Sequence, residues 1–298
     1  NFDKKMMTKS KFHSEIWVRN IGLPLYNQFY NLFSKNTLQA TDLEIREAYM
    51  FVNGFIFKNL DLTIGRQFIN WGTADKINPT RNLNPDDFED ILDFGRKRGT
   101  DAIKMTYYLN NSFSLEGVIT PFFRPSNLPI GDFAGVMSAN IDIPPELPQI
   151  IRYDSLFMPE PNLRENFNAG ARFKGMVLGF DFSVSYVYGR DFLPQPYFGQ
   201  VMPLTETEYV FDVNFQYPRQ HVIGFDIAGN LLGVGVWAEV AMFKPVEDVV
   251  FSMQIPLPMP PYPVPFAIVD TTILPADEPY FKYVILSLIH ISEPTRPY

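Results

Sequence analysis

The chain has 298 residues, a formal net charge of −8 and no cysteine. The acidic balance argues against nucleic acid as a partner, because phosphate binding requires a basic footprint, and the lack of cysteine excludes thiol catalysis and cysteine-ligated metal. Hydrophobic residues make up 46% of the chain, yet its mean hydropathy is only −0.07. No segment reaches the roughly 18 consecutive apolar residues of a membrane-spanning helix, whereas strands that alternate apolar and polar side chains explain both values.

Two-residue alternation recurs along the chain and predicts one strand after another. In the first clear hairpin, Ile103, Met105 and Tyr107 alternate with Lys104 and Thr106 before a tight turn. The expected strands lie at 11–20, 42–53, 59–71, 102–109, 112–120, 166–174, 180–188, 223–228 and 232–242, with one more before residue 285. The fold class expected is therefore all-β, as an incomplete antiparallel transmembrane β-barrel of about ten strands.

The connections between these strands fall into two classes that alternate along the chain. Short turns are expected at Asn110-Asn111, Gly175–Gly179 and Gly229-Asn230, and long loops rich in Pro, Asp and Asn at 72–100, 122–164, 189–219 and 244–278. Short periplasmic turns and long extracellular loops are typical of bacterial outer-membrane barrels. The alternating run 209–215 inside one long loop is interpreted as a strand extension above the membrane.

Two charged residues disturb the alternation. Glu47 shares the parity of Leu43 and Ile45, which a β-bulge or a position near the interface would resolve. Arg66 shares the parity of Leu62 and Ile64 and would face lipid, so it is expected either near the rim of the barrel or beside a bulge.

A dense polar segment follows the strand 59–71, and its motifs resemble those of a known class of proteins. The run GRQ…WG…NP is similar to uncharacterised porin-like outer-membrane barrels of Gram-negative bacteria that are grouped as domains of unknown function. WAE at 237–239 adds to this resemblance, which covers most of residues 41–285. The motif residues are Gly65, Arg66, Gln67, Trp71, Gly72, Asn78 and Pro79. The resemblance implies an outer-membrane barrel and no particular substrate.

The same segment supplies the candidate pore constriction, because a loop folded into a lumen needs charged groups that sort solutes. The constriction candidates are Asp75, Lys76, Arg81, Asp86, Asp87, Arg96 and Arg98. The alternative is a solvated loop on the outer surface. The residues expected to line the lumen are Glu44, Arg46, Lys104, Glu116, Arg172, Lys174, Asp181, Asp226 and Glu239.

The two ends of the chain are interpreted separately. Leu286–Arg296 reads LSLIHISEPTR, which matches the translation of a sequencing-library adapter, so residues 1–285 are expected to be the partial barrel and 286–298 an artefactual tail. The chain begins at Asn1 with no signal-peptide-like segment and is interpreted as a mature form or a fragment, with sequence missing at both ends.

The function expected from these features is diffusion of small solutes through a bacterial outer-membrane pore, with loop 72–100 and lumen charges setting selectivity. The proline-rich run 255–263 motivates an alternative, an outer-membrane transporter of hydrophobic compounds, and a carbohydrate-binding β-protein is a second alternative. No enzyme signature, metal site or cofactor is expected. The expected partners are the lipid bilayer, lipopolysaccharide and small solutes, with the oligomeric state left open.

Overall fold

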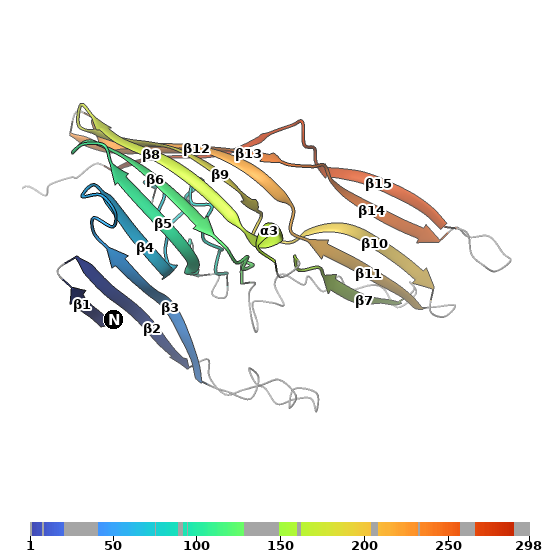
Figure 1. The fold of residues 1–298 in the computed structure, drawn as a ribbon. Coiled ribbons are helices and arrows are strands. Elements are labelled where there is room, and N and C mark those ends of the chain that lie inside the picture. The colour runs from blue at the N-terminus through green and yellow to red at the C-terminus, as the bar shows by residue number, and fades with distance from the viewer. Residues whose placement is uncertain are drawn as a thin grey trace, which may run out of the picture.

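The computed structural model describes residues 2–7, 9–20, 41–74, 76–88, 92–93, 95–127, 149–159, 162–203, 208–231, 233–256 and 266–288. An 11-stranded sheet dominates it (Figure 1). In spatial order the sheet contains β1 (Phe2–Met7), β2 (Ser10–Asn20), β3 (Thr41–Val52), β4 (Leu60–Gln67), β5 (Thr100–Tyr108), β6 (Phe113–Thr120), β8 (Asn168–Val177), β9 (Phe180–Arg190), β12 (Arg219–Leu231), β13 (Val234–Pro245) and β16 (Tyr280–Leu288). Every neighbouring pair is antiparallel and spatial order follows chain order. The predicted all-β antiparallel barrel is confirmed as an open wall whose edges are β1 and β16.

The two faces of this wall differ in polarity. Along β6, Leu115, Gly117 and Ile119 are exposed, whereas Glu116 and Val118 between them are buried. The same alternation runs through β9 and β12. We call the exposed, mainly apolar side the outer face and the opposite side the inner face. An apolar outer face and a polar inner face are the pattern of a transmembrane barrel.

The predicted alternation of short turns and long loops along the chain is also confirmed. The β8–β9 turn contains Leu178 and Gly179 with φ of 53° and 82°, as a two-residue hairpin turn with two left-handed positions requires. The third turn lies later than predicted, because Gly229 and Asn230 still pair with Val236 and Gly235. Gly233, at φ 88°, follows that pairing and lies in the actual turn.

A second, five-stranded sheet was not predicted. It contains, in order, β15 (Phe266–Leu274), β14 (Val249–Pro256), β10 (Gln195–Pro203), β11 (Glu208–Gln216) and β7 (Gln149–Leu156). These strands come from three of the long loops, and Figure 1 shows them beyond the long-loop end of the main sheet. The run 209–215 thus lies in β11, outside the barrel wall as interpreted, but within a sheet that joins separate loops.

Helix is almost absent from the described residues. α3 (Leu163–Asn166) is a single turn in which the Asn162 side chain accepts from the backbone N–H of Glu165. In the described part of the chain, no helix is long and apolar enough to cross a membrane.

A β-bulge explains why Glu47 has the same sequence parity as the outward-facing Leu43 and Ile45. A bulge was one of the two explanations predicted. Glu15 of β2 pairs with Glu47, but the next residue, Ile16, pairs with Ile45, so Arg46 is the extra residue. The shift leaves both Arg46 and Glu47 on the inner face, with Ile45 exposed on the outer face.

Arg66 lies at the long-loop end of β4, one residue before the strand ends. Its guanidinium donates to both carboxylate oxygens of Asp101 on β5, at 3.0 and 3.1 Å, and to the carbonyl oxygen of Ile45. The Arg66 charge is therefore paired with Asp101 near the rim of the barrel. A position near the rim was one of the two predicted for Arg66.

The two unusual segments near the C-terminus lie partly outside the described residues. The adapter-like tail contributes its first three residues to β16, where Leu286 pairs with Trp237, and 289–298 are not described. In the proline-rich run, residues 257–263 are likewise outside the described part.

Candidate functional site

In its described residues, the first long loop, 68–99 between β4 and β5, folds against the inner face of the barrel. Its apolar side chains Ile69, Trp71 and Leu83 are each 1% exposed. They form one cluster with inward-facing residues of five wall strands: Ala102, Val118, Val187, Val222, Ala241 and Phe243. The inner face is otherwise polar, and its apolar side chains lie where the apolar side chains of the loop pack against it. We call residues 68–99 the inner loop.

Trp71 fixes the inner loop to β6 and β8. Its indole N–H donates to a carboxylate oxygen of Glu116, which also accepts from Thr106 and faces the guanidinium of Arg172 at 3.6 Å. The Arg172 guanidinium lies 5.5 Å from the centre of the Trp71 ring. Gly170 provides the room, because a Cβ there would lie 2.7 Å from the indole. The indole N–H is therefore satisfied, and the ring packs closely against β8.

Glu239 of β13 fixes the loop to the opposite part of the wall. One carboxylate oxygen accepts from the backbone N–H groups of Thr73 and Ala74. The other accepts from the hydroxyl of Thr80 at 3.0 Å and from its backbone N–H at 3.4 Å. With 2% of its surface exposed, Glu239 is a buried anion whose charge is satisfied by four donors of the loop.

Asn84 joins the beginning of the inner loop to its end. Its side-chain oxygen accepts from the N–H of Ile69 at 2.7 Å, and its amide donates to the carbonyl oxygens of Gln67 and Arg98 at 3.2 and 2.9 Å. The residue is completely buried. These three bonds hold the loop as a closed unit, independent of the bonds that hold it to the wall.

Charged side chains of the inner loop are mostly paired with one another. Asp87 has no exposed side-chain surface and lies 2.9 Å from Arg96 and 3.9 Å from Arg46 of β3. Lys97 and Asp86 form a second pair at 2.5 Å. Burial lowers the pKa of the Lys97 ammonium, and the neighbouring Asp86 carboxylate opposes that shift. The loop thus presents ion pairs, not two separated arrays of opposite charge.

Two cavities lie along the inner face, and they share no lining residue. The larger, of about 810 Å³, extends toward the short turns and is lined by Asp61, Lys104, Glu116, Arg172, Lys174 and Asp181 among others. The smaller, of about 310 Å³, lies toward the long loops and includes Arg81, Asp86, Lys97, Arg190, Asp191 and Lys282 in its lining. Inner-loop residues take part in both linings, so the loop lies between them.

The predicted constriction residues that the structure describes divide into three groups. Arg81 and Asp86 line the smaller cavity. Asp87, Arg96 and Arg98 are committed to contacts within the fold, since Arg98 donates to the carbonyl oxygen of Pro125. Lys76, with φ of 61°, is exposed and pairs with Asp93 at 3.3 Å. Asp75 lies outside the described residues.

The predicted lumen residues all lie on the inner face by alternation. Lys104, Glu116, Arg172, Lys174 and Asp181 line the larger cavity. The other four are Glu44 and Arg46 on β3, Asp226 on β12 and Glu239 on β13. Among these, Arg46, Asp226 and Glu239 are buried under or beside the inner loop.

The motif residues lie at the end of β4 and in the first half of the inner loop. Gly65 and Gly72 have φ of 124° and 89°, and a Cβ on Gly65 would lie 2.3 Å from the backbone oxygen of Ala48. Gln67 is buried and donates to the carbonyl oxygen of Ala102 at 3.1 Å. Asn78 accepts from the hydroxyl of Thr80 at 3.0 Å, and Pro79 is buried beside it. Thr73 and Thr80, which follow the WG and NP segments directly, both donate to Glu239 of the WAE segment.

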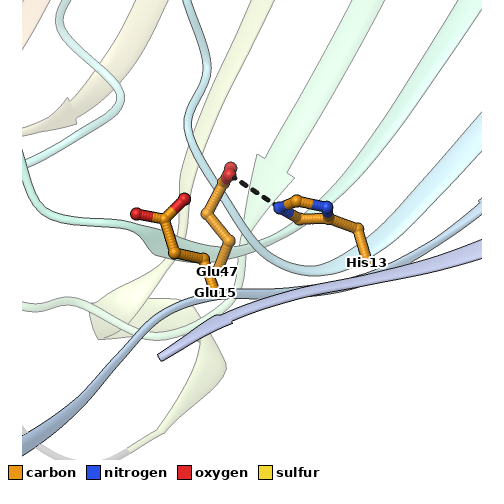
Figure 2. Close-up of side chains that lie close together, drawn as sticks. All are labelled: His13, Glu15 and Glu47. Atoms are coloured by element: carbon orange, nitrogen blue, oxygen red, sulfur yellow. Dashed lines mark ion pairs between the residues drawn. The ribbon is translucent and has the colours of Figure 1, made fainter. Parts of the chain in front are cut away.

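One cluster of metal-ligating side chains was missed from the sequence. His13, Glu15 and Glu47 lie close together on the inner face of β2 and β3 (Figure 2). Glu47 is far from the other two along the chain, and the alternation placed it on the wrong face. Only the β2–β3 register with its bulge brings the three together.

The fold and its inner loop define an antiparallel β-barrel wall with a loop held inside it. The family described as "Protein of unknown function (DUF1302)" matches residues 12–281, so the chain belongs to that family. This agrees with the predicted resemblance to domains of unknown function. No curated protein matches the chain.

Among solved structures, the chain is similar to the FrpB iron transporter from Neisseria meningitidis (F3-3 variant). The two share 12% sequence identity and a TM-score of 0.37 over 82% of this chain and 34% of that one. The chain therefore spans about a third of the length of that structure.

Proposed function

We propose that the chain forms part of an outer-membrane channel for small solutes, in which the inner loop is the constriction. The observation that carries this proposal is the position of the inner loop between two cavities with no lining residue in common. In a barrel closed by further strands, a solute that enters one cavity would have to pass the loop to reach the other. The role proposed is transport without a chemical step.

Selectivity in this channel would come first from size. The charges of the inner loop are largely neutralised in pairs such as Asp87–Arg96 and Lys97–Asp86, so they exert little field beyond their own contacts. The larger cavity carries both signs on its wall, with Lys104 and Lys174 facing the same space as Asp61 and Asp181. These groups would tune passage by charge where the path is narrow.

The outer face carries a group of residues that suits a membrane boundary at the long-loop end. The Arg219 guanidinium lies 5.2 Å from the ring centres of both Phe167 and Tyr188, and the Tyr186 hydroxyl is 2.7 Å from Nδ1 of His221. Aromatic rings concentrate at membrane interfaces, and a cation among them suits the phosphate groups of lipopolysaccharide. This supports the bilayer and lipopolysaccharide as partners, with the long loops on the extracellular side.

Single-channel recording in planar bilayers tests the proposal on the refolded full-length protein. We expect discrete conductance steps, and we expect larger steps when residues 73–98 are replaced by a short Gly/Ser linker. A matched control shortens the hairpin of β10 and β11 at its tip, beyond the paired residues Gln200 and Asp212, and leaves Gln195 at its base, which lines the smaller cavity, unchanged.

Each outcome has a definite meaning. If neither the wild type nor the loop-replaced variant conducts, the pore proposal is wrong. If the wild type conducts and the loop replacement leaves the step size unchanged, the inner loop is not the constriction. Liposome swelling with sugars, amino acids and short aliphatic solutes then identifies the solute class, including the hydrophobic compounds of the alternative function.

A further inference from the structure

The β2–β3 hairpin places one histidine and two carboxylates in a small cluster on the inner face. His13 and Glu15 share the inner face of β2, and the bulge at Arg46 brings Glu47 of β3 directly opposite Glu15 in the register. Figure 2 shows the three side chains close together on the same side of the strands, with Glu47 paired to His13. The His13 and Glu47 side chains are only 13% and 17% exposed. We propose that His13, Glu15 and Glu47 bind a divalent transition-metal ion.

The distances suit coordination. Each residue offers one ligand atom, and the three atoms lie within 4.8 Å of one another. Nε2 of His13 and Oε2 of Glu47 are 3.3 Å apart. Metal–nitrogen and metal–oxygen bonds of about 2.1 Å place tetrahedral ligands roughly 3.4 Å apart. One edge of the coordination shell is thus already formed, and small side-chain rotations of Glu15 complete the set.

Both carboxylates also accept a hydrogen bond from a donor outside the cluster. The Trp17 indole donates to Oε1 of Glu15 at 2.7 Å, and the backbone N–H of Phe68 in the inner loop donates to Oε1 of Glu47 at 3.1 Å. The His13 ring lies against Tyr49, with ring centres 5.0 Å apart. Outer-shell bonds of this kind orient metal ligands and raise affinity.

The donor set selects the class of ion. One imidazole nitrogen with two carboxylate oxygens suits borderline ions such as Zn²⁺, Fe²⁺ or Mn²⁺, whereas Ca²⁺ and Mg²⁺ prefer all-oxygen sites. Three protein ligands leave at least one position for water or a solute. Glu47 also lines the larger cavity, so that position is reached from the barrel interior. The cluster would bind metal whether or not the barrel conducts.

Calorimetric titration of the refolded, chelator-treated protein with Zn²⁺ tests the site, with Co²⁺ absorption as a second readout of nitrogen and oxygen ligation. We expect one ion per chain and a loss of affinity of at least about tenfold in His13→Ala. The matched control is His221→Ala, because His221 lies on the outer face beside Tyr186 and belongs to no metal-ligating cluster among the described residues. Its affinity should equal that of the wild type.

The double variant Glu15→Gln/Glu47→Gln covers the case in which His13→Ala fails to fold. Glutamine keeps an oxygen for the Trp17 and Phe68 donors but removes both negative charges, so Zn²⁺ binding should be lost while the fold remains. The proposal is overturned if the wild type binds no Zn²⁺ at submillimolar concentration. It is equally overturned if the folded cluster variants bind as tightly as the wild type.

Discussion

Glu239→Gln should release the inner loop from the barrel wall. The carboxylate of Glu239 accepts four hydrogen bonds from Thr73, Ala74 and Thr80. Glutamine keeps one oxygen and presents an NH₂ group to the donors that faced the other, so at least two bonds are lost. Bonds to a buried charged acceptor are worth about 1.5–3 kcal/mol each. A net cost of about 3 kcal/mol shifts the loop roughly a hundredfold toward the detached state.

Limited trypsin digestion measures this shift, because the inner loop contains Arg81 and the run Arg96–Arg98. Cleavage of a transiently opened segment follows its open population when closing is faster than cleavage. The expected result is much faster cutting within 81–98, identified by fragment mass, with the barrel strands still resistant.

Asp226→Asn is the matched control for this experiment. Asp226 lies directly opposite Glu239 in the β12–β13 register and is similarly buried, but it accepts from Ser183 of β9, within the wall. In the Asp226→Asn variant, trypsin should cut the inner loop at the wild-type rate. Equal rates for Glu239→Gln and wild type, or equal acceleration in both variants, would show that Glu239 does not hold the loop.

Three further outcomes follow from contacts of the same region. Gly170→Val should lower the free energy of unfolding by about 1–3 kcal/mol and speed cleavage of the inner loop, because the valine side chain would displace Trp71. Gly117→Val is the control, because nothing lies near its Cβ, and it should change neither the stability nor the cleavage rate. Asp87→Asn should cost about 3–5 kcal/mol in urea unfolding, since it leaves buried guanidinium groups without their anion. Burial raises the pKa of Asp191, so its carboxylate costs stability above its folded pKa and nothing below the unfolded value of about 3.9. Asp191→Asn should therefore raise the melting temperature at pH 7 and leave it unchanged below about pH 4.

The wall of the barrel was predictable because its signals are local. Alternation such as that of Ile103 with Lys104 indicates which side chains share a face, and the short turns indicate where the chain reverses direction. The position of Glu47 shows the limit of this reasoning. One extra residue in a strand exchanges the faces beyond it, and only the partner strand determines where that residue lies.

The candidate site was predictable in composition and not in contacts. For the polar segment after β4 the sequence left two interpretations open, a loop inside the lumen or a loop on the outer surface, and the structure places it against the inner face. The distribution of its charges could not be read from the sequence, because Asp86 and Asp87 are neighbours with different surroundings. Asp86 lines a cavity, whereas Asp87 is buried between Arg96 and Arg46. Asp87 differs from Asp86 because of contacts with residues far away in the sequence, such as Arg46 of β3.

The five-stranded sheet has a consequence for the order of folding. Two of its pairings, β7 with β11 and β10 with β14, are parallel and join segments from different long loops. Such pairs are far apart in sequence, so they carry a large entropic cost until the hairpins of the wall have brought the loops together. Amides of β7 and β14 should therefore gain protection from hydrogen exchange after those of β8 and β9 during refolding. We therefore expect the antiparallel hairpins of the wall to form before the five-stranded sheet.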